Sequence, residues 1–407
     1  MSETRSILKS RNFQLCFWSF FFLWISFDFF ILFPLFILRK GGNAVDVGFQ
    51  EAIFFFPSVL IRPIAGWCCD HIGRLKTLWT GSLMMILTGF SFLLLKGNYS
   101  EIHWWISLIL FLRGAGFAAF YTAFFTYAAD LSIPENRSRV IGLFGLSGLV
   151  GHGLAPLIGQ NVLDRYQFSG FFLTSACLSL LSLIISGFLT EKKLFEPQQR
   201  NGFQIAKTVT LTTRNIIILP ASFIFGYVVS SFNTFGAAYF ELTGKAQVGY
   251  FFLVYGMTAG LVRILLGGLA DRFPRQLLVI LFFFLQAGGL CFIVLQPVEH
   301  FYLITAALAG TAHGILFPTM TAMAIDAHPQ EYRGMVTSVF TGMMDVGFSL
   351  GSYIQGHIVA LTSYSFMFLS TGLVGFLFVV YVVVLRVLRF DSGHLSIHTK
   401  EEPNSTI

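Results

Sequence analysis

Two stretches of this chain decide its fold: residues 62–74 read RPIAGWCCDHIGR, and residues 263–275 read RILLGGLADRFPR. Arginine, glycine, aspartate and arginine recur at the same spacing in both stretches, and each equivalent pair lies 201 positions apart. A second set repeats at an offset of 196, in which Asp130, Glu135 and Arg137 are followed by Asp326, Glu331 and Arg333. Two multi-point matches with nearly equal offsets indicate an internal duplication.

The composition around these stretches is that of a membrane protein. Of the 407 residues, 55% are hydrophobic and 11% charged, and the mean hydropathy is +0.73. Soluble domains have about 25% charged residues, so an ordinary water-soluble enzyme is excluded. The net charge of +6 does not indicate nucleic-acid binding, because membrane proteins concentrate basic residues on cytoplasmic loops. Five cysteines without a CxxC pair predict neither a disulfide framework nor a metal site.

Apolar runs long enough to cross a bilayer predict an all-α protein, because such a span needs about 20 residues. Reading for these runs gives twelve spans, at 13–38, 47–68, 77–95, 104–129, 139–163, 169–190, 214–240, 248–270, 276–296, 300–326, 334–361 and 365–389. The polar stretch 191–213 divides them six and six.

The distribution of lysine and arginine predicts the topology. With the N-terminus inside, 18 of these residues fall on cytoplasmic segments, five on the other side and three within spans. The positive-inside rule therefore places both termini in the cytoplasm. The predicted units are an N-terminal six-helix bundle at 1–190, a cytoplasmic linker at 191–213, a C-terminal six-helix bundle at 214–389 and a cytoplasmic tail at 390–407.

The chain resembles the major facilitator superfamily (MFS) over nearly its whole length. The specific element is Gly66-x3-Asp70-x2-Gly73-Arg74-x-Lys76, which matches the family signature between helices 2 and 3, although Leu75 replaces a common basic residue. The resemblance implies twelve transmembrane helices in two pseudo-symmetric six-helix bundles, which transport a solute by alternating access, mostly as monomers without a cofactor. The predicted gating signature is Arg62, Gly66, Asp70, Gly73, Arg74 and Lys76, with a second copy at Arg263, Gly267, Asp271 and Arg275, where Pro274 occupies the glycine position.

Local chemistry supports a latch at this loop. Gly66 lets helix 2 approach a neighbour closely, Gly73 permits a tight turn, and Asp70 can pair with an arginine or a helix N-terminus. The alternative is purely topological, since Arg74 and Lys76 also satisfy the positive-inside rule. We further expect a cytoplasmic charge network of Arg62, Asp70, Asp130, Glu135 and Arg137, with a second-half copy at Arg263, Asp271, Asp326, Glu331 and Arg333.

Helix 5 carries a second pattern, Gly142-x8-Gly151-x3-Ala155-Pro156-x2-Gly159. It resembles the signature of the antiporter branch of the superfamily, in which glycine is frequent at two positions occupied here by Ala155 and Gln160. The small residues allow close helix packing and Pro156 bends the helix, so packing alone is the competing explanation.

Ionisable residues within spans are costly, so they are candidates for the proton or substrate pathway. Four lie near mid-span: Asp28 in helix 1, Arg113 in helix 4, His313 in helix 10 and Asp345 in helix 11. We expect Asp28 to carry protons, with its proton affinity tuned by a pair with Arg113. The alternative is that the Asp28–Arg113 pair only joins helices 1 and 4. The helix-4 arginine of similar proteins aligns with Leu110, almost one turn before Arg113, so its role does not transfer directly.

The remaining candidates each have two interpretations. Asp345 is a second protonatable group or a hydrogen-bonding residue within a packed interface. His313 binds a polar substrate, or it makes an interhelical hydrogen bond. His152 and His357 are weaker candidates.

The sequence therefore predicts secondary active transport of a small solute in a bacterial inner membrane, favouring proton-coupled efflux by antiport. A proton- or sodium-coupled nutrient importer shares every gating element, and a transporter-like sensor is a remote alternative. No enzyme, metal, cofactor or nucleic-acid function is predicted, because no motif for one is present.

Overall fold

The computed structural model describes residues 10–131, 137–191, 215–244, 247–295, 300–328 and 333–397, with side chains not described at 137–142, 270–271, 333–334 and 388–397. Every regular element in these ranges is a helix. The first six-helix group contains α2 (Arg11–Asp28), η1 (Phe29–Leu32), α3 (Phe33–Arg39), α4 (Ala44–His71), α5 (Arg74–Ser91), η2 (Phe92–Leu94), α6 (Tyr99–Asp130) and α7 (Arg137–Ser186). The second contains α9 (Asn215–Thr243), α10 (Val248–Leu266), α11 (Leu269–Arg272), α12 (Arg275–Leu295), α13 (Phe301–Asp326), α14 (Arg333–Leu361) and α15 (Tyr364–Ile397).

The helices match the predicted spans, with some differences at their ends. Ten segments are long and apolar enough to cross a membrane, one of which covers the two spans predicted within α7. Gln167, with φ 56°, interrupts the helical backbone of α7 between those two spans. The predicted span 334–361 corresponds to α14, which is helical although it is not among the ten. α15 continues to Ile397, past the predicted end at 389.

Local sequence fixes where several helices begin. The Ser10 hydroxyl accepts from the Phe13 amide at the start of α2, and Asn43 with Asp46 forms a reciprocal capping box at the start of α4. Gly73 precedes α5 with φ 125°, a conformation that strongly favours glycine. These caps set the turns that bring successive helices back across the bundle.

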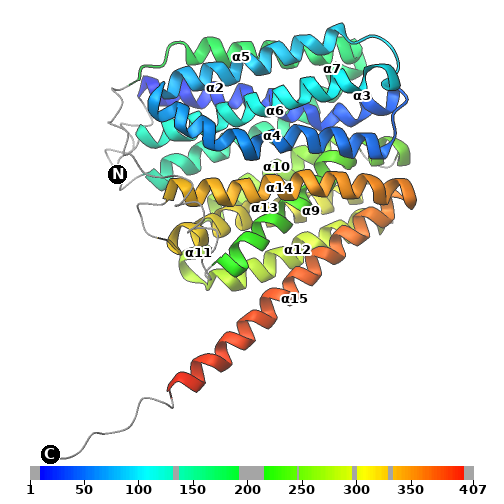
Figure 1. Ribbon diagram of the computed structural model, residues 1–407. Helices are drawn as coiled ribbons and strands as arrows, with labels where there is room; N and C mark the ends of the chain where they lie inside the picture. Colours follow the sequence, from blue (N-terminus) through cyan, green and yellow to red (C-terminus); the bar gives the residue numbers. More distant parts are fainter. Residues whose placement is uncertain are drawn as a thin grey trace, which may run out of the picture.

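The two groups of helices form two halves that lie side by side (Figure 1). Equivalent contacts inside the halves show the internal duplication. A Cβ on Gly114 of α6 would overlap the carbonyl oxygen of Phe54 in α4, and a Cβ on Gly310 of α13 would overlap that of Tyr255 in α10. These residues are related by the offsets of 196 and 201 found in the sequence. The halves therefore share a packing scheme as well as a sequence motif.

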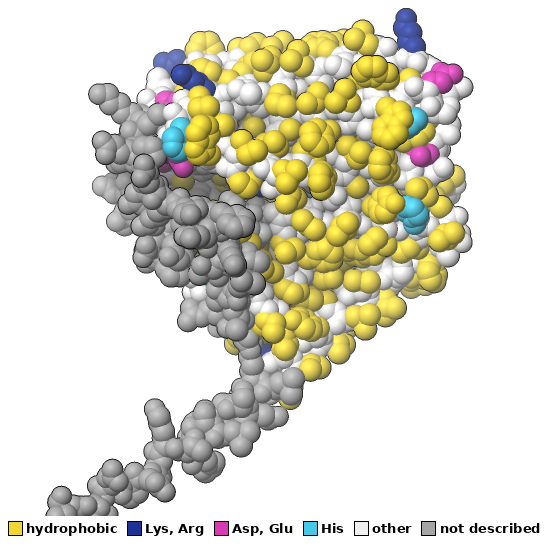
Figure 2. Space-filling view, viewed as in Figure 1, with side chains coloured by type: hydrophobic (Ala, Val, Ile, Leu, Met, Phe, Trp, Pro, Cys, Tyr) yellow, Lys and Arg dark blue, Asp and Glu magenta, His cyan; other side chains and the backbone are white. Residues whose placement is uncertain are grey.

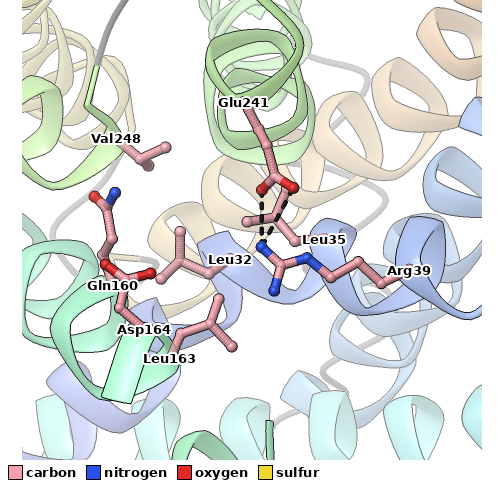
Figure 3. Close-up of a pocket in the computed structure, with 8 residues that line it drawn as sticks. All are labelled: Leu32, Leu35, Arg39, Gln160, Leu163, Asp164, Glu241 and Val248. Carbon is pink, nitrogen blue, oxygen red and sulfur yellow. Dashed lines mark hydrogen bonds and ion pairs between the residues drawn. The ribbon is translucent and has the colours of Figure 1, made fainter. Parts of the chain in front are cut away.

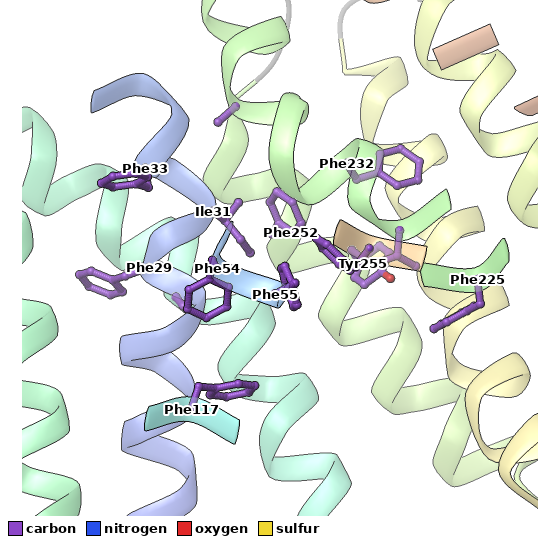
Figure 4. Packing of buried hydrophobic residues seen from close by; sticks show 14 of the residues in the cluster. Phe29, Ile31, Phe33, Phe54, Phe55, Phe117, Phe225, Phe232, Phe252 and Tyr255 are labelled. Atoms are coloured by element: carbon purple, nitrogen blue, oxygen red, sulfur yellow. The ribbon is translucent and has the colours of Figure 1, made fainter. Parts of the chain in front are cut away.

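The halves meet mainly where α4 packs on α14 and α7 packs on α10. Glycines permit both contacts, since a Cβ on Gly48 would overlap the Ser352 carbonyl and one on Gly256 would lie 2.7 Å from the Gly153 Cα. Aromatic rings from both halves fill the space between these helices, as Figure 4 shows for Phe54, Phe55, Phe252 and Tyr255.

The surface pattern is that of a membrane-embedded bundle. Figure 2 shows hydrophobic side chains covering the flank of the molecule, with charged and histidine side chains gathered towards the two ends of the helices. We call the end that carries Ser10, Gly73 and Glu191 the N-terminal face, and the end that carries Gly41 and Gly97 the opposite face (Figure 1).

Candidate functional site

Asp28 lies within the first span, where the chain changes from α-helix to a 3-10 turn at Phe29. Its side chain is buried, and its Oδ2 atom lies 3.1 Å from Nδ1 of His152 in α7. Trp24, one turn earlier on the same helix face, packs against Gly151, the neighbour of His152. Trp24 also makes a side-chain hydrogen-bonding contact to Asp28. His152 Nε2 is buried and has no hydrogen-bond partner among the described residues. Asp28 thus belongs to a polar cluster that retains a free hydrogen-bonding atom.

The predicted Asp28–Arg113 pair is wrong. Arg113 donates to the Met85 carbonyl at 3.2 Å, to the Ser26 carbonyl at 2.9 Å and to the Ser175 hydroxyl at 3.1 Å. Its guanidinium also lies 3.7 Å from the centre of the Phe30 ring. The reason is geometric, because residues two apart on a helix do not share a face. The first span presents Ser26 to Arg113, so Asp28 faces away from Arg113. Arg113 therefore ties helices together inside the first half.

His313 joins this region from the second half. Its Nδ1 atom lies 2.5 Å from the hydroxyl of Tyr255, which is itself buried in α10. The Tyr255 ring lies 5.3 Å from the His152 ring, centroid to centroid, across the contact between α7 and α10. The hydrogen bond expected of His313 is confirmed. Asp28, His152, Tyr255 and His313 consequently form a line of polar side chains that crosses from one half to the other.

Asp345 makes a buried ion pair between the halves. Its Oδ2 atom accepts from Arg62 Nε at 2.8 Å and from the Ser58 hydroxyl at 2.6 Å, and Arg62 Nη2 lies 2.7 Å away. The Arg62 guanidinium also lies 4.8 Å from the centre of the Tyr121 ring. The expected membership of Arg62 in the loop network is therefore wrong, because the arginine is drawn into the interface by a carboxylate on α14.

The loop network on the N-terminal face is centred on Arg74. Its Nε atom lies 3.0 Å from Asp130 Oδ2 and its Nη2 atom 3.7 Å from Asp70 Oδ1, while its backbone amide donates to Glu191. In the second half Arg275 Nη1 lies 2.6 Å from Asp326 Oδ2, which is the equivalent pair. Lys76 is exposed on α5. Glu135, Glu331, the side chains of Arg137, Asp271 and Arg333, and residues 192–213 of the expected linker lie outside the described residues.

The signature glycines have different roles. Gly73 provides the turn, and a Cβ there would lie 3.1 Å from the Glu191 carboxylate. The close approach expected at Gly66 is absent, since no atom lies within 4 Å of a Cβ at that position. Gly267 follows α10 as its C-cap, and a Cβ there would meet the carbonyl of Arg263 in its own chain segment.

The helix-5 pattern does pack closely. A Cβ on Gly151 would lie 3.1 Å from Trp24 Cδ1, and one on Gly159 would lie 3.1 Å from Leu32 Cδ1. Pro156 lies inside α7, while the side-chain surroundings of Gly142 are outside the described residues. These contacts place α7 between the first span and α10, which brings His152 next to Asp28.

A pocket of about 360 Å³ opens on the opposite face between the halves. Figure 3 shows Arg39 of α3 reaching Glu241 of α9 across it, with Nη2 3.2 Å from each carboxylate oxygen. Gln160 lines the same pocket and accepts from the Gly249 amide at 3.0 Å. An ion pair therefore joins the halves at this end, in addition to the Arg62–Asp345 pair closer to the N-terminal face.

The sequence predicted a lesser role for His152 than the structure gives it, and it did not indicate Tyr255 or Glu191. His152 is the partner of Asp28, whereas the hydrogen bond of His357 among the described residues is to the Tyr353 carbonyl of its own helix. Tyr255 and Glu191 were not considered, because neither tyrosine in an apolar run nor glutamate at a loop edge is distinctive. Among the described residues no cluster of metal-ligating side chains occurs.

Comparisons with known proteins identify the family of the chain. The family description Major Facilitator Superfamily matches residues 15–246 and 221–406. A staphylopine export protein of Staphylococcus aureus is 21% identical over 370 residues, covering 86% of this chain and 88% of that protein. An uncharacterized MFS-type transporter of Burkholderia pseudomallei is 20% identical, covering 82% and 81% of the two chains.

Solved structures show the same fold at low identity. A mutant peptide transporter POT in complex with alafosfalin has a TM-score of 0.74 at 12% identity, covering 92% of this chain and 94% of that one. A mutant of the nucleoside transporter NupG has the same TM-score and identity, with 92% and 99% covered.

Proposed function

The chain belongs to the major facilitator superfamily of membrane transporters, and from this premise we propose that it exports a small solute in exchange for protons by alternating access. Two observations favour export. The named relative is an exporter, and the glycine pattern of helix 5, which resembles the antiporter branch, packs tightly against neighbouring helices. We place the protein in a bacterial inner membrane as a monomer, with its N-terminal face and both termini towards the cytoplasm.

The observation that carries the proposal is the buried contact between Asp28 and His152. The carboxylate and the imidazole lie 3.1 Å apart, so a change of charge on one acts directly on the other. A carboxylate in an apolar span is costly unless it is protonated or has a partner. A solute that enters beside the pair therefore changes which of these two states is favoured. His152 Nε2 has no hydrogen-bond partner among the described residues, so it is available to an incoming solute, whose arrival would then displace a proton.

The position of the pair suits this exchange. Asp28 and His152 belong to the first half, and Tyr255 and His313 continue the polar line into the second. A rocking of the halves about the α4–α14 and α7–α10 contacts would expose this line to each face in turn. The Arg62–Asp345 and Arg39–Glu241 pairs join the halves at different depths and would break at different stages of the cycle.

The test uses everted vesicles with an acidic interior. Candidate solutes (cationic drugs, sugars, amino acids and chelating metabolites) are added while a pH-sensitive dye reports the proton gradient. We expect a solute-dependent loss of the gradient in the wild type, retention of that response in Asp164→Asn, and its absence in Asp28→Asn. Asp164 is the matched control because it is an exposed carboxylate at the pocket on the opposite face. Proton-coupled transport by Asp28→Asn would refute the assignment, and solute accumulation in the reverse direction would make the protein an importer.

A further inference from the structure

Arg263 lacks the carboxylate partner that its equivalent in the first half has. It is the equivalent of Arg62, 201 positions later in the chain. Arg62 contacts Asp345 of α14 across the halves. The same arrangement in the other half would place a carboxylate on α7 opposite Arg263.

The register between α7 and α14 identifies the position where that carboxylate is missing. Ser349 of α14 donates to the Ala52 carbonyl of α4, and a Cβ on Gly153 of α7 would lie 3.5 Å from the Leu253 carbonyl of α10. Residues 349 and 153 are 196 apart, and residues 253 and 52 are 201 apart, as in the sequence motifs. The equivalent of Asp345 is therefore Leu149, which is buried.

Arg263 consequently lies at the interface without an acidic partner. Among the residues that the structure describes, no carboxylate lies within ion-pair distance of it, and its Nε atom is buried without an acceptor. Its Nη1 atom is 3.0 Å from the position of a Cβ on Gly145, one turn from Leu149. Arg263 also interacts electrostatically with Tyr121 of α6 and His313 of α13. Helices of both halves thus surround one uncompensated cation, an arrangement that is costly within a membrane.

We propose that Arg263 binds the carboxylate of the transported solute, which makes the substrate class a small organic carboxylate. The planar guanidinium fork matches a carboxylate, and the solute supplies the charge that Leu149 does not. A carboxylate group of the solute would supply the negative charge that Arg263 lacks, whereas Arg62 already has a carboxylate partner. This assignment rests on the proposed transport function and specifies its substrate.

Binding of succinate to the purified protein in detergent tests the assignment. Thermal unfolding is followed by tryptophan fluorescence while succinate or the uncharged succinamide is added at constant ionic strength. We expect a saturable rise in Tm with succinate and none with succinamide. Arg263→Gln should weaken the apparent affinity for succinate by about tenfold or more, since it removes hydrogen bonds to a charged group. A purely structural role would lower the basal Tm and leave the succinate-dependent rise intact.

Leu149→Asp and Leu149→Asn provide the matched controls. The aspartate restores the missing symmetric acid, so it should pair with Arg263 and abolish the succinate effect, while the neutral asparagine should retain it. The proposal is overturned by the absence of a saturable rise in the wild type, by an unchanged succinate affinity in Arg263→Gln, or by equal loss in both Leu149 variants. The assay needs no proton gradient, so a failure here leaves the Asp28-dependent antiport standing, and a failure of antiport leaves carboxylate binding standing.

Discussion

Removing the charge of Asp345 should open the interface between the halves. Three donor atoms lie within 2.8 Å of its Oδ2 atom, and the side chains of Asp345 and Arg62 are 4% and 8% exposed. Breaking a buried pair from one side costs about 3–5 kcal/mol, because the other charge remains uncompensated. At about 1.4 kcal/mol per factor of ten, Asp345→Asn should reduce the population of the joined arrangement by about a hundredfold to several thousandfold, relative to the arrangement in which the pair is open.

Distances between the halves provide the measurement. In a cysteine-free background, spin labels at positions 76 and 272 report on the separation across the N-terminal face, because Lys76 and Arg272 are both exposed there. Asp345→Asn should move the distance distribution to longer values, and the double variant Arg62→Gln/Asp345→Asn should shift it less, since no unpaired charge remains. Identical distributions in the wild type and Asp345→Asn, or additive effects in the double variant, would refute the reasoning.

Three further results are expected from the geometry. Asp130→Asn should lower the free energy of unfolding by at most about 1 kcal/mol in chemical denaturation, because the side chain of Asp130 is 49% exposed and its pair with Arg74 is screened by solvent. Gly114→Ala should prevent stable assembly whereas Gly66→Ala should be tolerated, as judged by the monodisperse fraction in size-exclusion chromatography, because only the first would drive a Cβ into a neighbouring backbone. Arg113→Ala should lower the free energy of unfolding by at least about 3 kcal/mol, seen as a lower Tm, because it removes three hydrogen bonds of a charged group and leaves a cavity where a fully buried side chain was packed.

Much of the fold could be predicted because it depends on patterns along the sequence. Apolar runs of bilayer length and the repeat at 62–74 and 263–275 indicated the helices and their duplication. The equivalent pairs Arg74–Asp130 and Arg275–Asp326 follow from the same repeat. The division of α7 at Gln167 matches the predicted break between two spans, because the turn interrupts an otherwise apolar stretch.

Partners within the site could not be predicted, because they depend on the rotation of each helix about its axis. Asp28 and Arg113 were matched by depth alone, but Asp28 faces α7 and Arg113 faces the side of the first span that carries Ser26. A shift of two residues along a helix turns a side chain by more than half a turn, which spacing in the sequence does not reveal between different helices. The depth of a buried charge was therefore predictable, but its partner was not.

Comparing the two halves distinguishes residues with a structural role from residues with a functional role more clearly than the depth of a residue within its span does. Contacts present in both halves, such as those at Gly114 and Gly310, maintain the packing that each bundle needs. Contacts present in only one half are not needed for this shared packing. Arg62 has a carboxylate opposite it and its equivalent Arg263 has Leu149 in the corresponding register, so duplication alone does not explain the unpaired charge. A half-buried cation without a partner is costly within a membrane, and the proposed solute carboxylate would complete the pair for part of the transport cycle.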